Sequence, residues 1–258
     1  KRFFYRIAAV RFRGTNHQWL HYVRGYVLFA AVATALIFSV ASIVSWDFAV
    51  SSLPGWHTTI FGPYFLAGAI FSGCAMLMAI VIPLRRVFPG FGELIKIDDL
   101  ESLAKLLIFT SLIVTYVYAV EFFMAYYSGA PFERAIYWFR AFGESNLLFW
   151  LVVTCNAVVP IALWFKKVRR NIPALFIISL VILVGMWLER FVIVISSTAH
   201  GFSPFAWANY HFEWAEIWIT LGSFGWFFMW IFIMVKMVPF IAAAEMKERL
   251  TPPFRIRK

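Results

Sequence analysis

The sequence predicts an all-α integral membrane protein with six transmembrane helices. The chain is 62% hydrophobic and only 14% charged, whereas an ordinary soluble domain carries about 25% charged residues. Its mean hydropathy is +0.79. A helix needs roughly 20 apolar residues to cross the hydrocarbon of a bilayer, and six stretches meet that requirement. They are residues 26–50, 60–84, 103–127, 146–165, 172–195 and 214–235. We expect a four-helix bundle with the remaining spans peripheral to it.

Basic residues predict the orientation of these spans. All but three of the 23 Lys and Arg residues lie before the first span, close to the connections after the second and fourth spans, or after the sixth span. Loops rich in Lys and Arg remain on the cytoplasmic side of a membrane, so both termini are predicted to be cytoplasmic. The expected organisation is a basic cytoplasmic leader, a six-span transmembrane domain and a cytoplasmic tail, at residues 1–25, 26–240 and 241–258.

The composition excludes several classes of function. The net charge is +10, but the Lys and Arg residues occupy short loops between apolar runs, so nucleic-acid binding is not expected. The two cysteines, Cys74 and Cys155, lie inside apolar segments and form neither a disulfide framework nor a metal-ligand spacing. We therefore expect no metal site. The chain begins at Lys1 without a visible signal peptide, so its natural start is expected further upstream.

The stretch from Trp46 to Gly73 predicts a helical hairpin in the membrane. An apolar run carries Asp47 near its end, an uncharged turn through Trp56 and His57 follows, and a second apolar run begins at Phe61. An ionisable residue just inside a bilayer face is costly, so it is a candidate functional residue. The alternative interpretation is an interfacial Asp47 that lipid headgroups hydrate.

Ionisable residues of separate spans are predicted to share one layer of the membrane. Asp47, Glu121, Glu189 and Arg190 all lie within roughly 10 Å of the outward ends of their spans, at 1.5 Å per residue. No acid falls in the inner halves of the predicted spans. The outward loops contribute further polar residues, which are His57, His200, His211, Glu213 and Glu216.

Two interpretations of Glu121 and Glu189 remain open, a functional role and an internal salt bridge. Either carboxylate can form an internal salt bridge with Arg190, the cation available inside the spans. Glu189 and Arg190 are adjacent and point about 100° apart on a helix, so we expect them to need different partners. That geometry favours a network that joins several helices.

This set of groups fits two kinds of chemistry. A quinol loses two protons and two electrons on oxidation, so carboxylates or a histidine can accept the protons while Arg or Trp orients the headgroup. The same groups suit a proton path in a transporter, and the residues alone do not separate the two. A b-type haem is disfavoured, because it needs histidines on facing helices and no predicted span contains one.

Two phrases of the chain resemble one membrane-protein family. SIVSWDFAVSSLPGWHTTIFGPYFLAGAIFSG, which begins at Ser42, and GMWLERFVIVISS, which begins at Gly185, are similar to the polysulfide-reductase (NrfD-type) membrane subunits. Within that family the likeness is greatest to the quinol-oxidising subunit of bacterial alternative complex III. It extends from about Tyr26 to the end of the last span. Family members have eight to ten spans, so the six spans here are expected to form the C-terminal part of such a subunit.

The resemblance implies a partner-dependent enzyme subunit in the bacterial cytoplasmic (inner) membrane. It would bind quinone or menaquinone and carry no haem or iron–sulfur cluster itself. It would dock beneath an iron–sulfur subunit on the outer face, beside a homologous membrane subunit, and electrons would continue to c-type cytochrome subunits of a respiratory or photosynthetic complex. Protons would be released on the outer side, with proton translocation a further option. The alternatives are a proton-path subunit without a quinol site and a structural anchor for a periplasmic redox subunit.

The resemblance also assigns roles to residues of this chain. Asp47 and Arg190 would be quinol-site or proton-path residues, with His57, Glu121 and Glu189 as further catalytic candidates. Trp46, Trp56 and His57 would complete the quinol pocket around Asp47 and Arg190.

Overall fold

The computed structural model describes residues 12–13, 15–87, 92, 95–143, 145–208, 210 and 213–237, and these contain helices but no strand. Six helical segments are long and apolar enough to cross a membrane, which confirms the six predicted spans. They are α2 (Asn16–Ala49), α3 (Phe61–Val87), α5 (Ile97–Tyr127), the segment 146–164, α9 (Ile172–Ala199) and α10 (Trp214–Met237). The segment 146–164 is built from α7 (Asn146–Val153), η1 (Thr154–Val158) and η2 (Val159–Trp164). The described residues also form three short helices, α6 (Pro131–Phe142), α8 (Lys166–Arg169) and η3 (Pro204–Ala206).

The chain divides into two compact units, residues 1–40 with 239–258 and residues 41–238. The described part of the first unit is mainly the N-terminal portion of α2. This helix begins at Asn16, inside the predicted leader, and the Thr15 hydroxyl accepts a hydrogen bond from the Gln18 backbone N–H at 3.4 Å, as an N-cap residue does. The rest of the leader, residues 1–11 and 14, and the predicted tail 241–258 lie outside the described residues.

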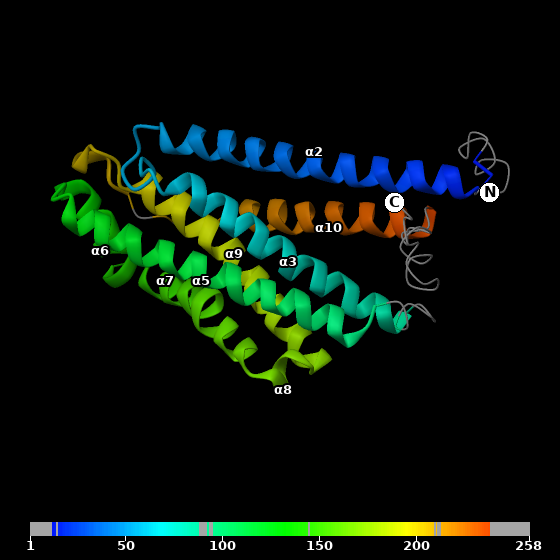
Figure 1. Ribbon diagram of the computed structural model, residues 1–258. Helices are drawn as coiled ribbons and strands as arrows, with labels where there is room; N and C mark the ends of the chain where they lie inside the picture. Colours follow the sequence, from blue (N-terminus) through cyan, green and yellow to red (C-terminus); the bar gives the residue numbers. More distant parts are fainter. Residues whose placement is uncertain are drawn as a thin grey trace. The chain divides into compact units, whose positions relative to one another are not determined.

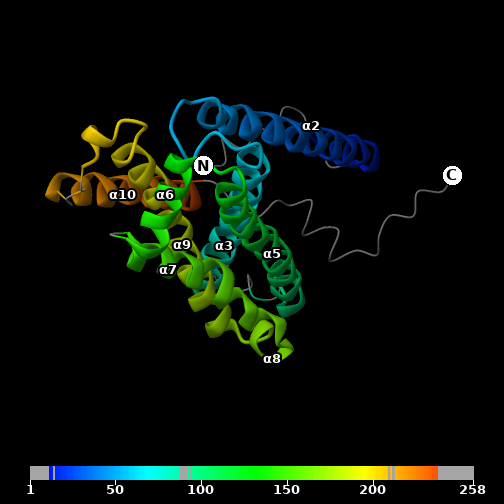
Figure 2. The same ribbon diagram turned by 90° about the vertical axis from the view of Figure 1, so that its left-hand side faces the viewer.

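Four spans of the second unit pack together in the order expected for an up-and-down bundle (Figures 1 and 2). Helix α3 packs against α5 and α9, while the span formed by α7, η1 and η2 packs against α5 and α9. Phe71, Ala75 and Met78 of α3 are fully buried in the bundle core, together with Leu107 of α5 and Ile182 of α9. By contrast, α10 contains no buried residue.

One end of this bundle, called here the α6 end, is covered by helix α6 and the turn between α2 and α3 (Figure 1). Helix α6 lies in the segment that the sequence predicts as an outward loop. It begins with Pro131 at its first position, where a missing N–H costs nothing. Its buried stripe includes Ile136, Tyr137 and Arg140. The turn carries Gly55 at φ +85°, a backbone conformation that glycine adopts without strain.

The fourth span is not a regular α-helix. Its central residues form a π-turn, η1, which is followed by the 3₁₀ segment η2. Pro160 lacks an N–H and cannot continue the i→i−4 hydrogen-bond ladder, which explains why the regular helix stops before it. The irregular stretch turns Cys155 and Asn156 into the bundle, where both are buried.

Candidate functional site

A group of polar side chains is concentrated near the α6 end of the bundle. We call it the polar cluster, and its members come from α3, α5, α6, η1 and α9. They are Tyr64, Tyr118, Glu121, Tyr137, Arg140, Asn156, Glu189 and Arg190. Its formal charges balance, with two carboxylates and two guanidinium groups. Buried charges are costly unless they are paired, so this group is the prime candidate for function.

Glu189 stands at the centre of the polar cluster and is 2% exposed. Its Oε2 accepts a short hydrogen bond from the Tyr118 hydroxyl and a second, at 3.1 Å, from Asn156 Nδ2. Asn156 Nδ2 also donates to the Tyr118 hydroxyl at 3.0 Å. Three side chains from α5, η1 and α9 therefore form a closed ring of hydrogen bonds.

Arg190 lies beside Glu189 and against two aromatic rings of α3. Its guanidinium carbon is 4.5 Å from the centre of the Phe65 ring and 5.5 Å from that of Tyr64, within the range of cation–π attraction. Its Nη2 is also 3.7 Å from Glu189 Oε1. The prediction that Glu189 and Arg190 need different partners is therefore wrong in part, because the long arginine side chain reaches back to its neighbour.

A glycine of α3 provides the room that this arginine occupies. A Cβ at Gly68 would lie 2.8 Å from Arg190 Nη2 and 3.1 Å from Met186 Cε. Both distances are shorter than an ordinary van der Waals contact. The absence of a side chain at Gly68 thus allows Arg190 to lie against α3.

Glu121, Tyr137 and Arg140 line a cavity of about 30 Å³ together with Glu189. Glu121 is 7% exposed and makes no hydrogen bond or ion pair with another described residue. The Tyr137 hydroxyl is buried without a hydrogen-bond partner. The volume is enough for about two water molecules. Burial, reinforced by the nearby Glu121 carboxylate, raises the pKa of Tyr137, so its hydroxyl remains a donor.

Arg140 is the functional candidate that sequence reasoning missed. It is 4% exposed, its Nε donates to Ser196 Oγ at 2.6 Å, and its Nη2 donates to Ser197 Oγ at 2.9 Å. The sequence places it in an outward loop, yet it lies one helical turn after Ile136 on the apolar stripe of α6. That helical spacing was the available signal. Arg190 is therefore not the sole cation available to Glu121 and Glu189.

A second cavity of about 110 Å³ lies beside the polar cluster, between α7 and α9. Ser196 lines it and also accepts the hydrogen bond from Arg140. His200 lines it as well, with Nδ1 3.2 Å from the Ser196 carbonyl oxygen and its ring stacked on Phe139 at 4.8 Å. Polar groups therefore continue from the cluster toward the α6 end.

The predicted residues of the hairpin lie outside the hydrogen-bonded ring. Trp56 is buried, and its Nε1 donates to the Ile193 carbonyl of α9 at 3.2 Å. His57 is exposed, and its Nε2 lies 2.9 Å from Glu133 Oε1. Trp46 is 59% exposed. Asp47 is exposed and makes no hydrogen bond or ion pair within the described part of the chain.

The structure therefore joins Glu121, Glu189 and Arg190 in one cluster, while Asp47 and His57 have separate surroundings. The quinol-binding role assigned to the hairpin residues remains a prediction. Of the other outward candidates, Glu216 accepts a short hydrogen bond from the Tyr210 hydroxyl. His211 lies outside the described residues.

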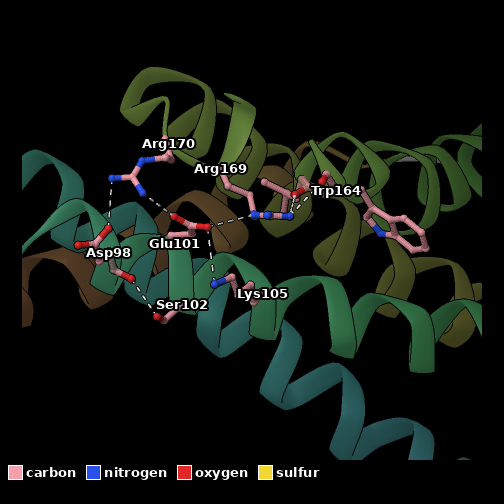
Figure 3. Close-up of polar contacts among 8 residues, drawn as sticks. Asp98, Glu101, Ser102, Lys105, Trp164, Arg169 and Arg170 are labelled. Atoms are coloured by element: carbon pink, nitrogen blue, oxygen red, sulfur yellow. Dashed lines mark hydrogen bonds and ion pairs between the residues drawn. The ribbon is translucent and has the colours of Figure 1, made fainter. Parts of the chain in front are cut away.

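A second group of charges lies at the opposite end of the bundle, called here the α8 end (Figure 3). Glu101 lies 3.1 Å from Arg170 Nη1, 3.6 Å from Lys105 Nζ and 3.7 Å from Arg169 Nε. Asp98 is 3.2 Å from Arg170 Nη2. These contacts connect the start of α5 to α8 and the residue after it.

The α8 end corrects the predicted start of the third span. Helix α5 begins at Ile97, earlier than the predicted start at residue 103, and so includes the buried Glu101. The Asp99 carboxylate accepts a hydrogen bond from the Lys96 backbone N–H at 2.8 Å, which caps the extended helix. Charged residues lower the hydropathy at the start of α5. A prediction from apolar runs therefore places the start of this span too late.

Among the described residues, no group of three or more His, Cys, Asp or Glu side chains is arranged to hold a metal ion. The chemistry that the polar cluster offers is proton exchange by carboxylates and phenols, oriented by two guanidinium groups and an amide.

Comparison with known families gives a match. A search among curated proteins found none that matches. A family model described as "Polysulphide reductase, NrfD" matches residues 8–200. The match covers well over half of the chain and includes every residue of the polar cluster. The chain therefore belongs to the NrfD family of polysulphide reductase membrane proteins.

Proposed function

We propose that the chain is a quinol-oxidising membrane subunit of an oxidoreductase complex and is active only within that complex. NrfD-family proteins are quinone-interacting membrane subunits of redox complexes that contain iron–sulfur subunits. The observation that carries the proposal is the charge-balanced polar cluster buried near one end of the bundle. Quinol oxidation releases two protons, and buried carboxylates are suitable acceptors; one of them, Glu189, is hydrogen-bonded to a phenol.

The proposal separates the quinol headgroup from the proton route. The cavity at Glu121 and Glu189 measures about 30 Å³, far below the roughly 300–1,000 Å³ of small-molecule pockets. The polar cluster is therefore assigned to protons and water. The headgroup is assigned to the hairpin, where Asp47, Trp46 and His57 are exposed and Trp56 connects the turn to α9.

The distribution of charge supports the orientation that we assign. Basic residues concentrate at the α8 end, where Lys166, Lys167 and Arg170 are exposed, and we assign this end and both termini to the cytoplasm. The leader 1–25 and the tail 241–258 then flank the transmembrane domain 26–240. The α6 end faces outward, where an iron–sulfur subunit would dock and protons would leave.

Within the family we assign the chain to the ActC subunit of bacterial alternative complex III, in the inner membrane. Its quinone would be menaquinone or a related quinone. A homologous membrane subunit and c-type cytochromes would be its further partners. The resemblance of the hairpin phrase and of the phrase at Gly185 supports this assignment, and the exposed α6 end offers the surface for docking.

A second candidate function is a proton-path subunit without a quinol site, similar to ActF. Two observations favour it. The cavity of the polar cluster does not have the volume for a headgroup, and Asp47 contacts no polar partner among the described residues. In that case Glu121 and Glu189 would relay protons that another subunit releases. The third possibility is a structural anchor for a soluble redox subunit. It assigns no chemistry to the polar cluster or to the hairpin residues.

Quinol oxidation by the purified complex distinguishes these functions. We expect Asp47→Asn and Glu189→Gln each to lower the rate by roughly 10²-fold or more in fully assembled complexes. Asp98→Asn is the matched control, because it neutralises an exposed carboxylate at the α8 end. Retained quinol oxidation with lost proton release in Glu189→Gln would favour the proton-path function. Full activity in both variants would contradict the proposal, and loss of assembly alone would favour an anchor.

A further inference from the structure

The π-turn in the fourth span presents one amide to the buried acid of α9. Asn156 is fully buried at the centre of η1. A Cβ at Gly185 would lie 2.4 Å from Asn156 Oδ1 and 2.5 Å from the Cys155 Cβ, so the turn fits only because α9 has no side chain there. Single π-turns inside helices occur frequently at functional sites.

The hydrogen bonds of this amide determine the direction of the whole ring. An amide nitrogen can only donate, and Asn156 Nδ2 donates toward the Tyr118 hydroxyl and Glu189 Oε2, which lie side by side at 3.0 and 3.1 Å from it. The reversed amide would leave both N–H groups unpaired. The Tyr118 hydroxyl thus accepts from Asn156 and must donate its own hydrogen to Glu189 Oε2. That oxygen accepts two hydrogen bonds, so it has no place for a proton of its own.

The other oxygen of Glu189 has different surroundings. Oε1 is buried, has no hydrogen-bond partner, and lies 3.7 Å from Arg190 Nη2. Glu189 also lines the cavity that it shares with Glu121 and Tyr137. The two oxygens of one carboxylate are therefore differentiated, one saturated by donors and one available.

We propose that Asn156 is a positioning residue that confines proton uptake and release at Glu189 to Oε1. The proton on Oε1 leaves toward the cavity, where water passes it to the Glu121 carboxylate. Glu189 returns to the carboxylate form, which the two donors on Oε2 and the Arg190 guanidinium stabilise. This inference rests on the proton-handling part of the proposed function, and it extends that function by naming the oxygen that exchanges the proton.

Other titratable groups also face Glu189, and a pH profile includes their contributions. They are Tyr64 from α3, Tyr118 and Glu121 from α5, Tyr137 and Arg140 from α6, and Arg190 from α9. Asn156 is the member of the ring that carries no proton to exchange. Its replacement therefore changes the hydrogen bonds without removing a titrating group.

The test compares Asn156→Leu with Thr154→Val in the complete complex. Thr154 belongs to the same π-turn, but its hydroxyl donates to the Trp150 carbonyl and does not reach the polar cluster. We expect Asn156→Leu to move the acidic limb of the quinol oxidation profile to higher pH by about one unit, because the carboxylate loses a donor. Tyr118→Phe should shift the profile in the same direction, and Thr154→Val should leave it unchanged.

Infrared difference spectroscopy separates the inference from the function on which it rests. The carboxylic C=O band that disappears in Glu189→Gln is assigned to Glu189, and we expect its frequency to change in Asn156→Leu and Tyr118→Phe. The inference is overturned if Glu189→Gln abolishes activity but Asn156→Leu and Tyr118→Phe change neither the band frequency nor the pH profile. If Glu189→Gln retains activity, the proposed function fails, and the band shift alone decides the inference.

Discussion

At the scale of single residues, the polar cluster shows how a bundle can hold two buried carboxylates and a buried guanidinium. Glu189 accepts hydrogen bonds from Tyr118 and Asn156 at Oε2 and lies beside Arg190, and Arg140 donates to two serine hydroxyls. Glu121 has no such partner among the described residues. Both buried carboxylates line the cavity, and Glu121, which has the fewest contacts, is suited to accept a proton there.

Removal of the Arg140 guanidinium should lower the free energy of unfolding. We expect Arg140→Leu to destabilise the fold by about 1–3 kcal/mol, because the buried Ser196 and Ser197 hydroxyls lose their charged donor. Thermal unfolding of the complex in detergent measures the effect. Arg134→Leu, at an exposed position of the same helix where the arginine bonds the Tyr126 carbonyl, is the control. Equal losses for the two variants would contradict the role given to Arg140.

Replacement of Gly68, which lies against Arg190, should affect activity with little effect on stability. Gly68→Ala brings a Cβ to 2.8 Å from Arg190 Nη2, but the end of a flexible side chain can move away. Alanine also favours the helix by up to about 1 kcal/mol. We therefore expect the free energy of unfolding to change by less than about 1 kcal/mol. The rate of quinol oxidation should fall, because the Arg190 guanidinium moves away from Glu189. Gly73→Ala is the control and should keep full activity, because a Cβ at Gly73 has no neighbour within 4 Å. Equal activity in the two variants would contradict the role given to Gly68.

At the scale of elements, the two ends of the bundle are held by different means. The α6 end uses a short amphipathic helix whose buried stripe reaches the core, whereas the α8 end uses a carboxylate shared by three cations. Glu101 connects the N-terminal part of α5 to the connection between η2 and α9 (Figure 3). Loss of that carboxylate should free α8 first.

Proteolysis reports on the α8 end directly. We expect Glu101→Gln to accelerate tryptic cleavage at Lys166 or Lys167, because Arg169 and Arg170 lose their common partner. Asp98→Asn removes one contact of Arg170 and should have a smaller effect. Mass spectrometry of the fragments over time gives the order of the rates. The account fails if the two variants are cleaved at the same rate as the unaltered chain.

The contact between η1 and α9 also belongs to the element scale. Gly185→Ala places a Cβ within 2.5 Å of Asn156 and Cys155, and backbone separation has to increase, since neither atom is at the end of a flexible chain. We expect a loss of about 1–3 kcal/mol or more in unfolding free energy. Gly222→Ala in α10, where nothing lies within 4 Å, should cost no stability, and similar melting temperatures for the two would refute the close contact.

At the scale of the whole molecule, the testable property is its orientation in the membrane. Ser52 lies in the exposed α2–α3 turn, and Lys167 is exposed at the α8 end. In a background where Cys74 and Cys155 are replaced by alanine, we expect Ser52→Cys to react with a membrane-impermeant maleimide in intact spheroplasts. Lys167→Cys should react only after the membrane is opened. The reverse pattern would place the α6 end in the cytoplasm and remove the outward proton exit.

The amino-acid sequence by itself determined the class of the protein, its six spans and the fact that Glu121, Glu189 and Arg190 lie at similar depth. These are properties of apolar run length and of position along a run, and both are local. Only the tertiary structure decided that Arg140 leaves its loop for the core, that Glu189 touches Arg190, and that Asp47 stands apart. Tyr118 and Glu189 are 71 positions apart, and Arg140 and Ser196 are 56 apart. Hydropathy measures how much apolar surface a helix has, but the rotation of each helix against its neighbours selects which polar groups meet.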